Sequence, residues 1–278
     1  MADEPLIVPP DGLYTPEIKP HSVEKIHLHN QYAHIFAAAM ARSWPQLAYI
    51  GLYAGAGRGL LSDTHEHIET SALAVLRQQP RFTDYVYVDN KPACVAALTE
   101  RVRPLRGTAR ITIIPGDVNE SIPLVRDALP PFSRSRGLLS FCFVDPFDLQ
   151  LRFSTIRALA DLRVDFLILL MLGVDGRRNF RTYLEDSAST RIGDLIDDPN
   201  WRHEYKRGTK PIHFLLTKFD QAMQGLGYPS AASDVHPIKV TGKGVFLYVL
   251  AFYSKSAAGR KFWSETRRGT AGQFSLGI

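Results

Sequence analysis

The sequence has little cysteine and no long hydrophobic run, and both absences restrict what the protein can be. Only two cysteines occur in 278 residues, Cys94 and Cys142. They supply neither a disulfide framework nor the paired spacing of a zinc site. No apolar run reaches the roughly 18 residues that cross a bilayer, and the segment 164–173 is too short. We therefore expect a protein of the reducing cytoplasm with no membrane segment.

The first residues lack the composition of a secretory signal. Residues 1–11 are acidic and contain proline, without a basic start or an apolar core. Five prolines fall within residues 1–20, where apolar residues show no period. We predict a flexible arm, extended or disordered, over 1–20. No linker or internal repeat follows, which predicts a single domain over 21–278.

Charge is nearly balanced, with 33 Lys and Arg against 28 Asp and Glu and a net charge of +5. A solvated basic surface is the ordinary explanation, and an anionic partner, nucleic acid first, is the alternative. Basic residues gather in the segment 174–211, which we interpret as a basic insertion for a substrate or partner. Within it, Arg177, Arg178 and Arg181 are the candidates for contacting RNA or DNA phosphates.

Strands and helices alternate along the chain. Ser22 can cap a helix that Pro45 stops, and a second helix is expected over 70–78. Apolar strands are expected at 47–52, 85–88, 109–114, 138–144 and 165–172, and helices between them at 91–103, 122–129 and 154–162. Later helices are expected over 177–191 and 212–226. Units of about thirty residues predict βαβ connections and a parallel sheet.

Two further apolar segments, 235–240 and 245–253, are separated by Thr241-Gly242-Lys243-Gly244, which predicts a hairpin. The fold class is therefore α/β, a Rossmann-like doubly wound and mostly parallel seven-stranded sheet with a C-terminal antiparallel hairpin. The polar segment 60–69 contains His65 and His67. We predict a flexible loop there and no metal site, because no second set of ligands is present.

A glycine-rich turn, Gly55-Ala56-Gly57-Arg58-Gly59, follows the first strand directly. Glycine lets the backbone approach a ligand without a Cβ in the way. If a helix follows the turn, its positive N-terminus suits an anion. This arrangement is the usual nucleotide-cofactor corner of a doubly wound sheet, and a chance glycine-rich loop is the alternative.

Acidic residues end the next strands. Asp89, Asp117 and Asp145 should meet the glycine turn at one crevice, because ligands bind outside the carboxyl ends of parallel strands. An acid at the end of the second strand is a natural acceptor for the two hydroxyls of a ribose. Each aspartate taken alone is more often a helix cap or turn former.

Asp145-Pro146-Phe147 suggests the kind of chemistry. A carboxylate and the proline carbonyl can accept hydrogen bonds from an exocyclic amine, while an aromatic ring stacks on the base, worth about 1–3 kcal/mol. A methyltransferase acting on an amine uses such a motif, and a dinucleotide dehydrogenase does not. The alternative is a strand-ending turn with Phe147 as core filler.

These motifs together resemble the class I S-adenosylmethionine-dependent methyltransferases, and more narrowly the three-Cys-motif partner protein (TcmP) family. The resemblance covers about 21–263 and rests on His21-Ser22 with Lys25, on 49–58, 87–90, 116–119 and 144–147, and on the strand 248–253. It implies a methyltransferase-like fold with S-adenosylmethionine as cofactor. It also implies a physical or genetic partner that carries the three-cysteine motif.

The resemblance also implies roles for individual residues. Asp89 would face the ribose, Asp117 the adenine amine, and Tyr53 with Gly55 and Gly57 the methionine part. Further cofactor-binding positions are Lys25, Ala54, Asn90 and Val118. Asp145, Pro146 and Phe147 would be catalytic.

The sequence departs from the family pattern at two positions. Gly51 stands where the family carries an acid that helps to hold the amino group of the cofactor. Asp148 stands where a glycine usually follows the D-P-F motif, and adds charge beside the amine site. Two functions stay open: an amine methyltransferase acting on nucleic acid, and a non-catalytic partner protein in which Gly51→Asp would restore cofactor binding. Cys142 is not in a Pro-Cys pair, so thiolate chemistry on cytosine is not indicated.

Overall fold

The computed structural model describes residues 6–131, 137–177, 179–206, 208–232, 234–240 and 244–274. The strands of its large sheet lie close to the expected ranges. They are β2 (Gln46–Leu52), β5 (Asp84–Asp89), β6 (Arg110–Pro115), β7 (Leu138–Val144), β8 (Val164–Leu170), β9 (His236–Lys239) and β10 (Phe246–Tyr253). The expected turn at Thr241-Gly242-Lys243 lies outside the described residues.

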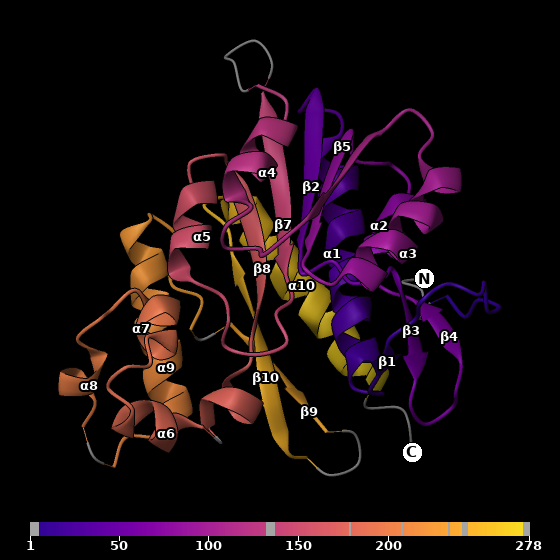
Figure 1. Ribbon diagram of the computed structural model, residues 1–278. Coiled ribbons are helices and arrows are strands. Elements are labelled where there is room, and N and C mark those ends of the chain that lie inside the picture. Colours follow the sequence, from indigo (N-terminus) through magenta and orange to yellow (C-terminus); the bar gives the residue numbers. More distant parts are fainter. Residues whose placement is uncertain are drawn as a thin grey trace.

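The sheet has the order β6-β5-β2-β7-β8-β10-β9. The first five strands run parallel, while β10 is antiparallel to both β8 and β9. This confirms the doubly wound, mostly parallel sheet with a C-terminal antiparallel hairpin (Figure 1). The prediction succeeded because strands buried on both faces consist of continuous apolar runs.

Helices cover both faces of the sheet (Figure 1). One face packs against α1 (Ser22–Met40), α2 (Ser71–Arg77), α3 (Pro92–Val102) and α10 (Ala257–Phe274). The other packs against α4 (Ile122–Ala128), α5 (Phe153–Leu159), α6 (Phe180–Glu185), α7 (Arg191–Ile196), α8 (Trp201–Glu204) and α9 (Pro211–Gly225). No helix in the described ranges is both long enough and apolar enough to cross a membrane.

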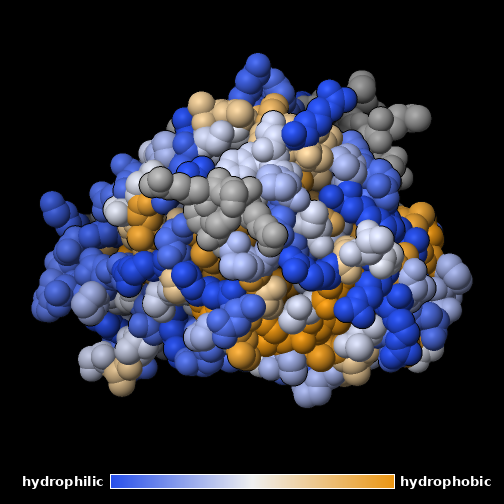
Figure 2. All heavy atoms as spheres, turned by 90° about the horizontal axis from the view of Figure 1, so that it is seen from above, coloured by the Kyte–Doolittle hydropathy of each residue, from blue (hydrophilic) through white to orange (hydrophobic). Residues whose placement is uncertain are grey.

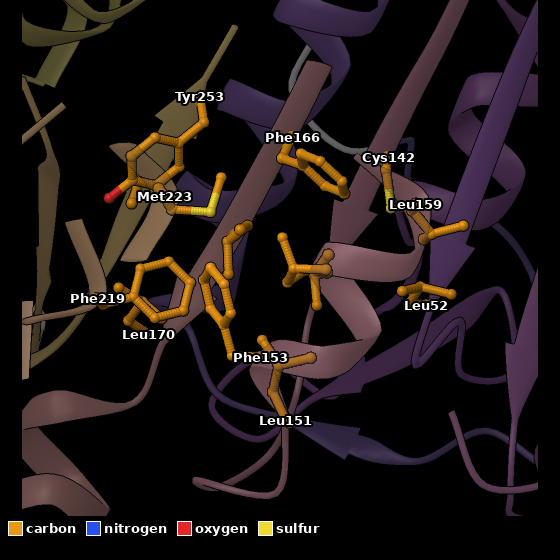
Figure 3. Packing of buried hydrophobic residues seen from close by; sticks show 14 of the residues in the cluster. Leu52, Cys142, Leu151, Phe153, Leu159, Phe166, Leu170, Phe219, Met223 and Tyr253 are labelled. Carbon is orange, nitrogen blue, oxygen red and sulfur yellow. The ribbon is translucent and has the colours of Figure 1, made fainter. Parts of the chain in front are cut away.

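Two hydrophobic cores result from the strand period of two residues. In β2, Leu47 and Tyr49 point to the core beneath α1, whereas Ile50 and its even-numbered neighbours point to the core beneath α5. Figure 3 shows part of the second core, where Cys142 of β7 lies among Leu52, Leu159 and Phe166.

The segment 60–69 is not the loop that the sequence predicted. It forms most of a hairpin, β3 (Arg58–Leu61) and β4 (His67–Glu69), and β1 (Glu17–Ile18) adds a third strand parallel to β3. Leu61 and Ile68 pack there against Ile26 of α1. The prediction was wrong because β3 and β4 are too short to show the two-residue alternation of a strand. The partner of β3, Glu17–Ile18, also lies far away in the sequence.

Four helical features also differ from what the sequence predicted. The helix expected over 177–191 is shortened to α6, because Asp186 begins a turn and accepts a hydrogen bond from the backbone N–H of Ala188. Helix α8 occupies a stretch expected to be only polar, and α10 was not predicted. Ser22 is the first residue of α1 and not its cap, since His21 precedes it.

Candidate functional site

The four predicted strand ends lie at the same edge of the sheet. Tyr53, Asp89, Asp117 and Asp145 end or follow β2, β5, β6 and β7, which run parallel. Strand β7 begins at the top of Figure 1, so this edge points downward there. Figure 2 looks down on the opposite edge, where hydrophilic and apolar side chains are mixed. The structure therefore brings the glycine turn and the three acids to one region.

The backbone of the glycine turn has left-handed conformations, with φ of 61° at Tyr53, 66° at Gly55 and 79° at Gly57. A Cβ at Gly55 would meet nothing within 4 Å, whereas one at Gly57 would lie 2.7 Å from Leu73 Cγ. Gly55 therefore leaves room for a ligand, and Gly57 lets α2 pack closely. The left-handed conformation of Tyr53 costs an L-residue about 1–2 kcal/mol relative to the right-handed one.

No helix begins at the glycine turn, which removes the expected helix N-terminus from the site. Strand β3 follows at Arg58, and α2 begins only at Ser71. The backbone N–H of Thr70 donates to Gly57 O at 2.9 Å and closes the hairpin back onto the turn. The turn must therefore bind a ligand through its own backbone and through the neighbouring strand ends.

Asp89 is buried and bound to the turn. Its Oδ2 accepts a hydrogen bond from Gly55 N at 2.8 Å, and its Oδ1 accepts one from Lys91 N at 2.9 Å. Ala54 N donates to Val88 O, so the turn is also held by the β5 backbone. Each carboxylate oxygen retains acceptor capacity, because an ionised carboxylate offers about four lone-pair sites. This geometry suits a diol, and Asn90 beside it is exposed.

Asp117 and Val118 lie on the next strand end. Asp117 is exposed, and its Oδ1 accepts a hydrogen bond from Asn119 N at 2.9 Å. Val118 is buried beneath it. Asn119 is held at both ends of its amide, since its Oδ1 accepts from Arg152 N and the Thr155 hydroxyl and its Nδ2 donates to Gln150 O. Asn119 thus fastens the start of α5 to the end of β6.

The hydroxyl of Tyr53 is buried and lacks a hydrogen-bond partner among the described residues. Burial, followed by the charges of Asp117 and Asp148, raises the pKa of Tyr53 well above its usual value. Asn119 lies beside the hydroxyl and offsets a small part of the rise, without a hydrogen bond of good geometry. The hydroxyl therefore stays protonated and can donate or accept a hydrogen bond.

Asp145 forms an ion pair with Lys25 of α1. The Lys25 Nζ lies 2.8 Å from Oδ1 and 2.6 Å from Oδ2 of Asp145, and both side chains are largely buried. The two residues are 120 positions apart in the chain. The resemblance assigned Lys25 to the cofactor and Asp145 to the amine, whereas the structure shows them bound to each other.

Phe147 projects into solvent directly after β7. Its side chain is 78% exposed, whereas the preceding Pro146 is buried. The interpretation of Phe147 as core filler is therefore wrong. A largely exposed aromatic side chain beside a carboxylate at the carboxyl edge of the sheet suits stacking on a planar ligand.

The two departures from the family pattern have structural counterparts. A Cβ at Gly51 would lie 3.0 Å from Tyr87 Cδ1 and 3.2 Å from Tyr49 Cε1, so tyrosine rings fill the space that an acid would need. Asp148 is paired, because Arg191 Nη1 of α7 donates to its Oδ2 at 3.2 Å. The negative charge of Asp148 is therefore partly balanced by Arg191, which belongs to the insertion 174–211.

The cysteines and histidines of the described ranges do not gather into a metal-binding group. Cys142 is fully buried in the core of Figure 3, and burial raises the pKa of its thiol far above the usual value. The described residues include no group of three His, Cys, Asp or Glu side chains that could hold a metal ion.

The N-terminal arm is fastened to the glycine turn by a buried arginine that the sequence did not reveal. Arg101 of α3 is 5% exposed and donates to both carboxylate oxygens of Asp11 and to Ala56 O at 2.8 Å. Arg58 donates to Pro9 O, and Asp11 pairs with it as well. The only sequence signal was one arginine among the buried positions of an amphipathic helix.

The predicted phosphate-binding arginines lie in a segment that is only slightly basic. Residues 174–211 contain eight Lys and Arg against seven Asp and Glu. Arg177 is exposed, Arg181 pairs with Glu185 at 2.7 Å, and Arg178 lies outside the described residues. Arg202 has a structural role, because it donates to the carbonyls of three residues in the insertion, Tyr183, Asp186 and Ser189.

Comparison with known proteins finds no matching family model and no matching curated protein. Many solved structures are similar in fold. The O-methyltransferase TomG from Streptomyces achromogenes, solved with SAM, is 14% identical over 82% of this chain and 79% of its own, with a TM-score of 0.42. TYW2 from P. horikoshii, in complex with MeSAdo, is 13% identical over 91% and 73%, with a TM-score of 0.39.

A Legionella pneumophila protein is 9% identical over 87% of this chain and 90% of its own, with a TM-score of 0.47. Likeness at this level indicates nothing about activity. The sheet itself, with antiparallel β10 inserted between β8 and β9, has the Rossmann-like methyltransferase fold that the resemblance implied.

Proposed function

We propose that the protein binds S-adenosylmethionine at the glycine turn and transfers its methyl group to an exocyclic amine of a nucleic acid base. One observation carries the proposal: a buried acceptor and an exposed aromatic ring stand on the same edge, on either side of the turn. Asp89 is fixed to Gly55, and Phe147 projects from the end of β7. Strands β5 and β7 flank β2, about 10 Å apart at two strand spacings.

The residues present fit most parts of the cofactor. The open space above Gly55 admits a ligand close to the backbone. Asp89 can accept from both ribose hydroxyls while keeping its two backbone hydrogen bonds. Asp117 is exposed beside it for the adenine amine. Position 51 does not fit, because Tyr87 and Tyr49 fill the space of the expected acid.

The bound cofactor would supply a methyl group carried on a positively charged sulfonium. The chain would supply alignment, since an amine needs no strong base but must present its lone pair to that methyl, and positioning lowers a barrier by several kcal/mol. Phe147 would stack on the base and Asp145 would accept a hydrogen bond from its amine. Lys25 Nζ already donates to both Asp145 oxygens, so the amine must share or replace this donor.

The Lys25–Asp145 pair is also the observation that favours a second function. A carboxylate satisfied by a lysine is a weaker acceptor for an amine, and Gly51 removes an expected cofactor contact. Both features suit a non-catalytic protein that keeps the fold and binds a partner. In keeping with the TcmP resemblance, that partner would carry the three-cysteine motif.

A methyl-transfer screen separates the two functions. Purified protein is incubated with radiolabelled S-adenosylmethionine and DNA, rRNA or tRNA, and labelled nucleosides are identified. For the enzyme, we expect transfer by wild type and none by Asp145→Ala, with the affinity for S-adenosylhomocysteine changed less than about threefold. Phe147→Ala should raise KM more than Phe147→Trp does, and Leu124→Ala, another exposed apolar side chain, is the matched control.

Full activity of Asp145→Ala would contradict the amine mechanism. The partner function is supported if wild type methylates no nucleic acid, binds S-adenosylhomocysteine, and gains no activity when Lys25→Met releases the Asp145 carboxylate.

A further inference from the structure

The Lys25–Asp145 ion pair lies where the amine of the acceptor is expected. Lys25 belongs to the first turn of α1, and its Nζ lies 2.8 Å and 2.6 Å from the two oxygens of Asp145. The two side chains are 14% and 19% exposed, so the pair keeps some contact with solvent. An ion pair removed this far from water adds little to stability, because the cost of desolvation offsets the attraction. Its place two residues before Phe147 therefore calls for a functional explanation.

The first turn of α1 is braced by the C-terminal hairpin. Glu24 Oε1 lies 2.7 Å from Nε2 of His236 in β9, so the acid next to Lys25 has a partner of its own. Tyr248 of β10 is 4% exposed, donates from its hydroxyl to His21 O at 3.5 Å and packs edge-on against the His21 ring. Two strands thus hold the turn that carries Lys25.

The ion pair retains one donor and several acceptor sites. An ammonium group has three N–H donors, and the two contacts with Asp145 use two of them. In the described ranges Nζ makes no other hydrogen bond, so the third donor remains for a ligand. An ionised carboxylate offers about four lone-pair sites, so Asp145 can also accept from a ligand. The pair therefore presents a donor beside an acceptor.

A donor beside an acceptor matches the Watson–Crick edge of two nucleic acid bases. Adenine and cytosine carry an amine there next to a ring nitrogen that has no hydrogen, so each offers a donor beside an acceptor. In guanine the ring nitrogen of this edge carries a hydrogen and would meet the lysine donor with a second donor. Uracil and thymine carry no amine at all.

We propose that Lys25 selects the base by donating a hydrogen bond to the ring nitrogen next to the amine, N1 of adenine or N3 of cytosine. This inference rests on the proposed function and deepens it. Asp145 accepts from the amine, and Phe147 stacks on the ring. Lys25 therefore contacts the acceptor and not the cofactor, to which the resemblance assigned it. The Watson–Crick edge must be free, so the base binds unpaired.

Base analogues that lack a single ring nitrogen test this assignment. Fluorescence anisotropy measures binding of thymine oligonucleotides that carry one adenine, cytosine or guanine, with and without S-adenosylhomocysteine. In 1-deazaadenine and 3-deazacytosine the amine is kept and the neighbouring ring nitrogen is replaced by C–H. The control analogue, 3-deazaadenine, lacks a nitrogen that is remote from the amine.

The protein variants separate the donor from the charge. Lys25→Met removes the donor, and Lys25→Gln keeps a neutral one. Lys19→Met is the matched control, because the Lys19 side chain is 58% exposed just before α1 and pairs with Glu17. Thermal unfolding checks that each variant is folded.

We expect wild type to bind 1-deazaadenine or 3-deazacytosine about tenfold more weakly than the parent base, because a hydrogen bond to a charged donor is lost. Guanine should bind as weakly as the deaza base, and 3-deazaadenine within twofold of adenine. In Lys25→Met the parent and deaza bases should bind equally. Lys25→Gln should keep part of the discrimination and Lys19→Met all of it.

The proposal is overturned if wild type binds each deaza base as tightly as its parent, or if Lys25→Met keeps the full discrimination. An equal loss of affinity for every oligonucleotide in Lys25→Met, with discrimination unchanged, would show that Lys25 only holds Asp145. Discrimination without methyl transfer would contradict the proposed function and leave base selection by Lys25 intact. Methyl transfer without discrimination would contradict base selection alone.

Discussion

The two halves of the candidate site hold their carboxylates in different ways. In the cofactor half, the ends of β2, β5 and β6, Asp89 and Asp117 accept hydrogen bonds from backbone N–H groups. In the acceptor half, the end of β7, Asp145 and Asp148 are held by side-chain cations from α1 and α7. Backbone donors are fixed by the fold, whereas long cationic side chains can rotate away.

This difference indicates which half is preorganised. The cofactor half can receive a ligand without moving, because its acceptors are already in place and retain lone pairs. The acceptor half must exchange partners, since Lys25 occupies both oxygens of Asp145. Binding there is therefore expected to be weaker and more dependent on the incoming group.

Removing the anchor of the cofactor half should have the largest effect. Arg101→Met removes the hydrogen bonds of the buried guanidinium to Asp11, Thr15 and Ala56 O, so the free energy of unfolding should fall by about 3–5 kcal/mol. S-adenosylhomocysteine should bind more weakly as the turn loosens. Urea unfolding measures the first effect and calorimetry the second.

Arg103→Met is the matched control, since Arg103 is 71% exposed in its side chain and pairs only with Glu100 among the described residues. It should change stability by less than about 1 kcal/mol. Equal, small effects of both substitutions would show that the arm is not anchored through Arg101.

A buried histidine, His29 of α1, contacts both β2 and β7 and makes the stability of the fold depend on pH. His29 donates to or accepts from Tyr49 OH at 2.9 Å and packs on Phe143, and burial lowers its pKa from 6.5 to about 4. Between these values the unfolded chain binds more protons, so falling pH destabilises the fold. The stability conferred by neutral His29 is present above pH 6.5, and about 3 kcal/mol of it is lost as pH falls through 4.

The comparison of wild type with His29→Gln isolates this effect. Asp165, whose pKa is raised to about 6 mainly by burial, has the opposite pH dependence and cancels in the difference. The stability advantage of wild type should shrink by about 3 kcal/mol from pH 7 to pH 4 in urea titrations. His34→Gln, an exposed histidine of the same helix, should show no such change; a parallel pH profile for His29→Gln would refute the assignment.

Restoring the missing acid should damage the cofactor half, contrary to the expectation from the resemblance. Gly51→Ala should lower the free energy of unfolding by about 1–3 kcal/mol, because its Cβ presses on Tyr87 and Tyr49. Gly51→Asp should cost more and should not improve binding of S-adenosylhomocysteine. Gly225→Ala, at a helical glycine with open space, is the control. Tighter binding by a stable Gly51→Asp would contradict this.

The smallest effect concerns the insertion beside the acceptor half. If Arg177 contacts phosphate, Arg177→Ala should reduce the salt dependence of nucleic acid affinity by about one unit of slope. Arg181→Ala should change it less, because Arg181 is paired with Glu185. Lys261→Ala on α10, at the other face of the sheet, should leave the salt dependence of nucleic acid affinity unchanged. If Lys261→Ala lowers it as much as Arg177→Ala does, the protein attracts nucleic acid only through its overall charge.

Much of the fold was predictable because its strands carry strong local signals. The apolar run 138–144 coincides with β7, and the boundaries of the other strands differ from the expected ones by one or two residues at most. Short elements paired over long distances were not predictable: β3 and β4 depend on Glu17–Ile18, and nothing in 58–69 reveals that partner. Helix α6 is shorter than expected because Asp186 forms a local turn.

In the candidate site, too, features with a local sequence signal were predictable and contacts between distant residues were not. The positions of Asp89 and Gly55 were predictable because each ends or follows a strand that its own apolar run reveals, and parallel strands end at one edge of the sheet. The Lys25–Asp145 and Asp148–Arg191 pairs join residues that are distant in sequence, so no spacing indicates them. The filled space at Gly51 depends on Tyr87 of the neighbouring strand, and a sequence pattern does not show how a ring is placed.

The most direct test of the central claim is a calorimetric titration of the wild-type protein with S-adenosylhomocysteine, S-adenosylmethionine and NADH, repeated with Asp89→Asn. We predict one site for the first two ligands, much weaker binding of NADH, and a loss of about tenfold, or about 1.4 kcal/mol, in Asp89→Asn. Asp63→Asn should bind as wild type does. Absence of binding by wild type, tighter binding of NADH, or unchanged affinity in a folded Asp89→Asn would contradict the account.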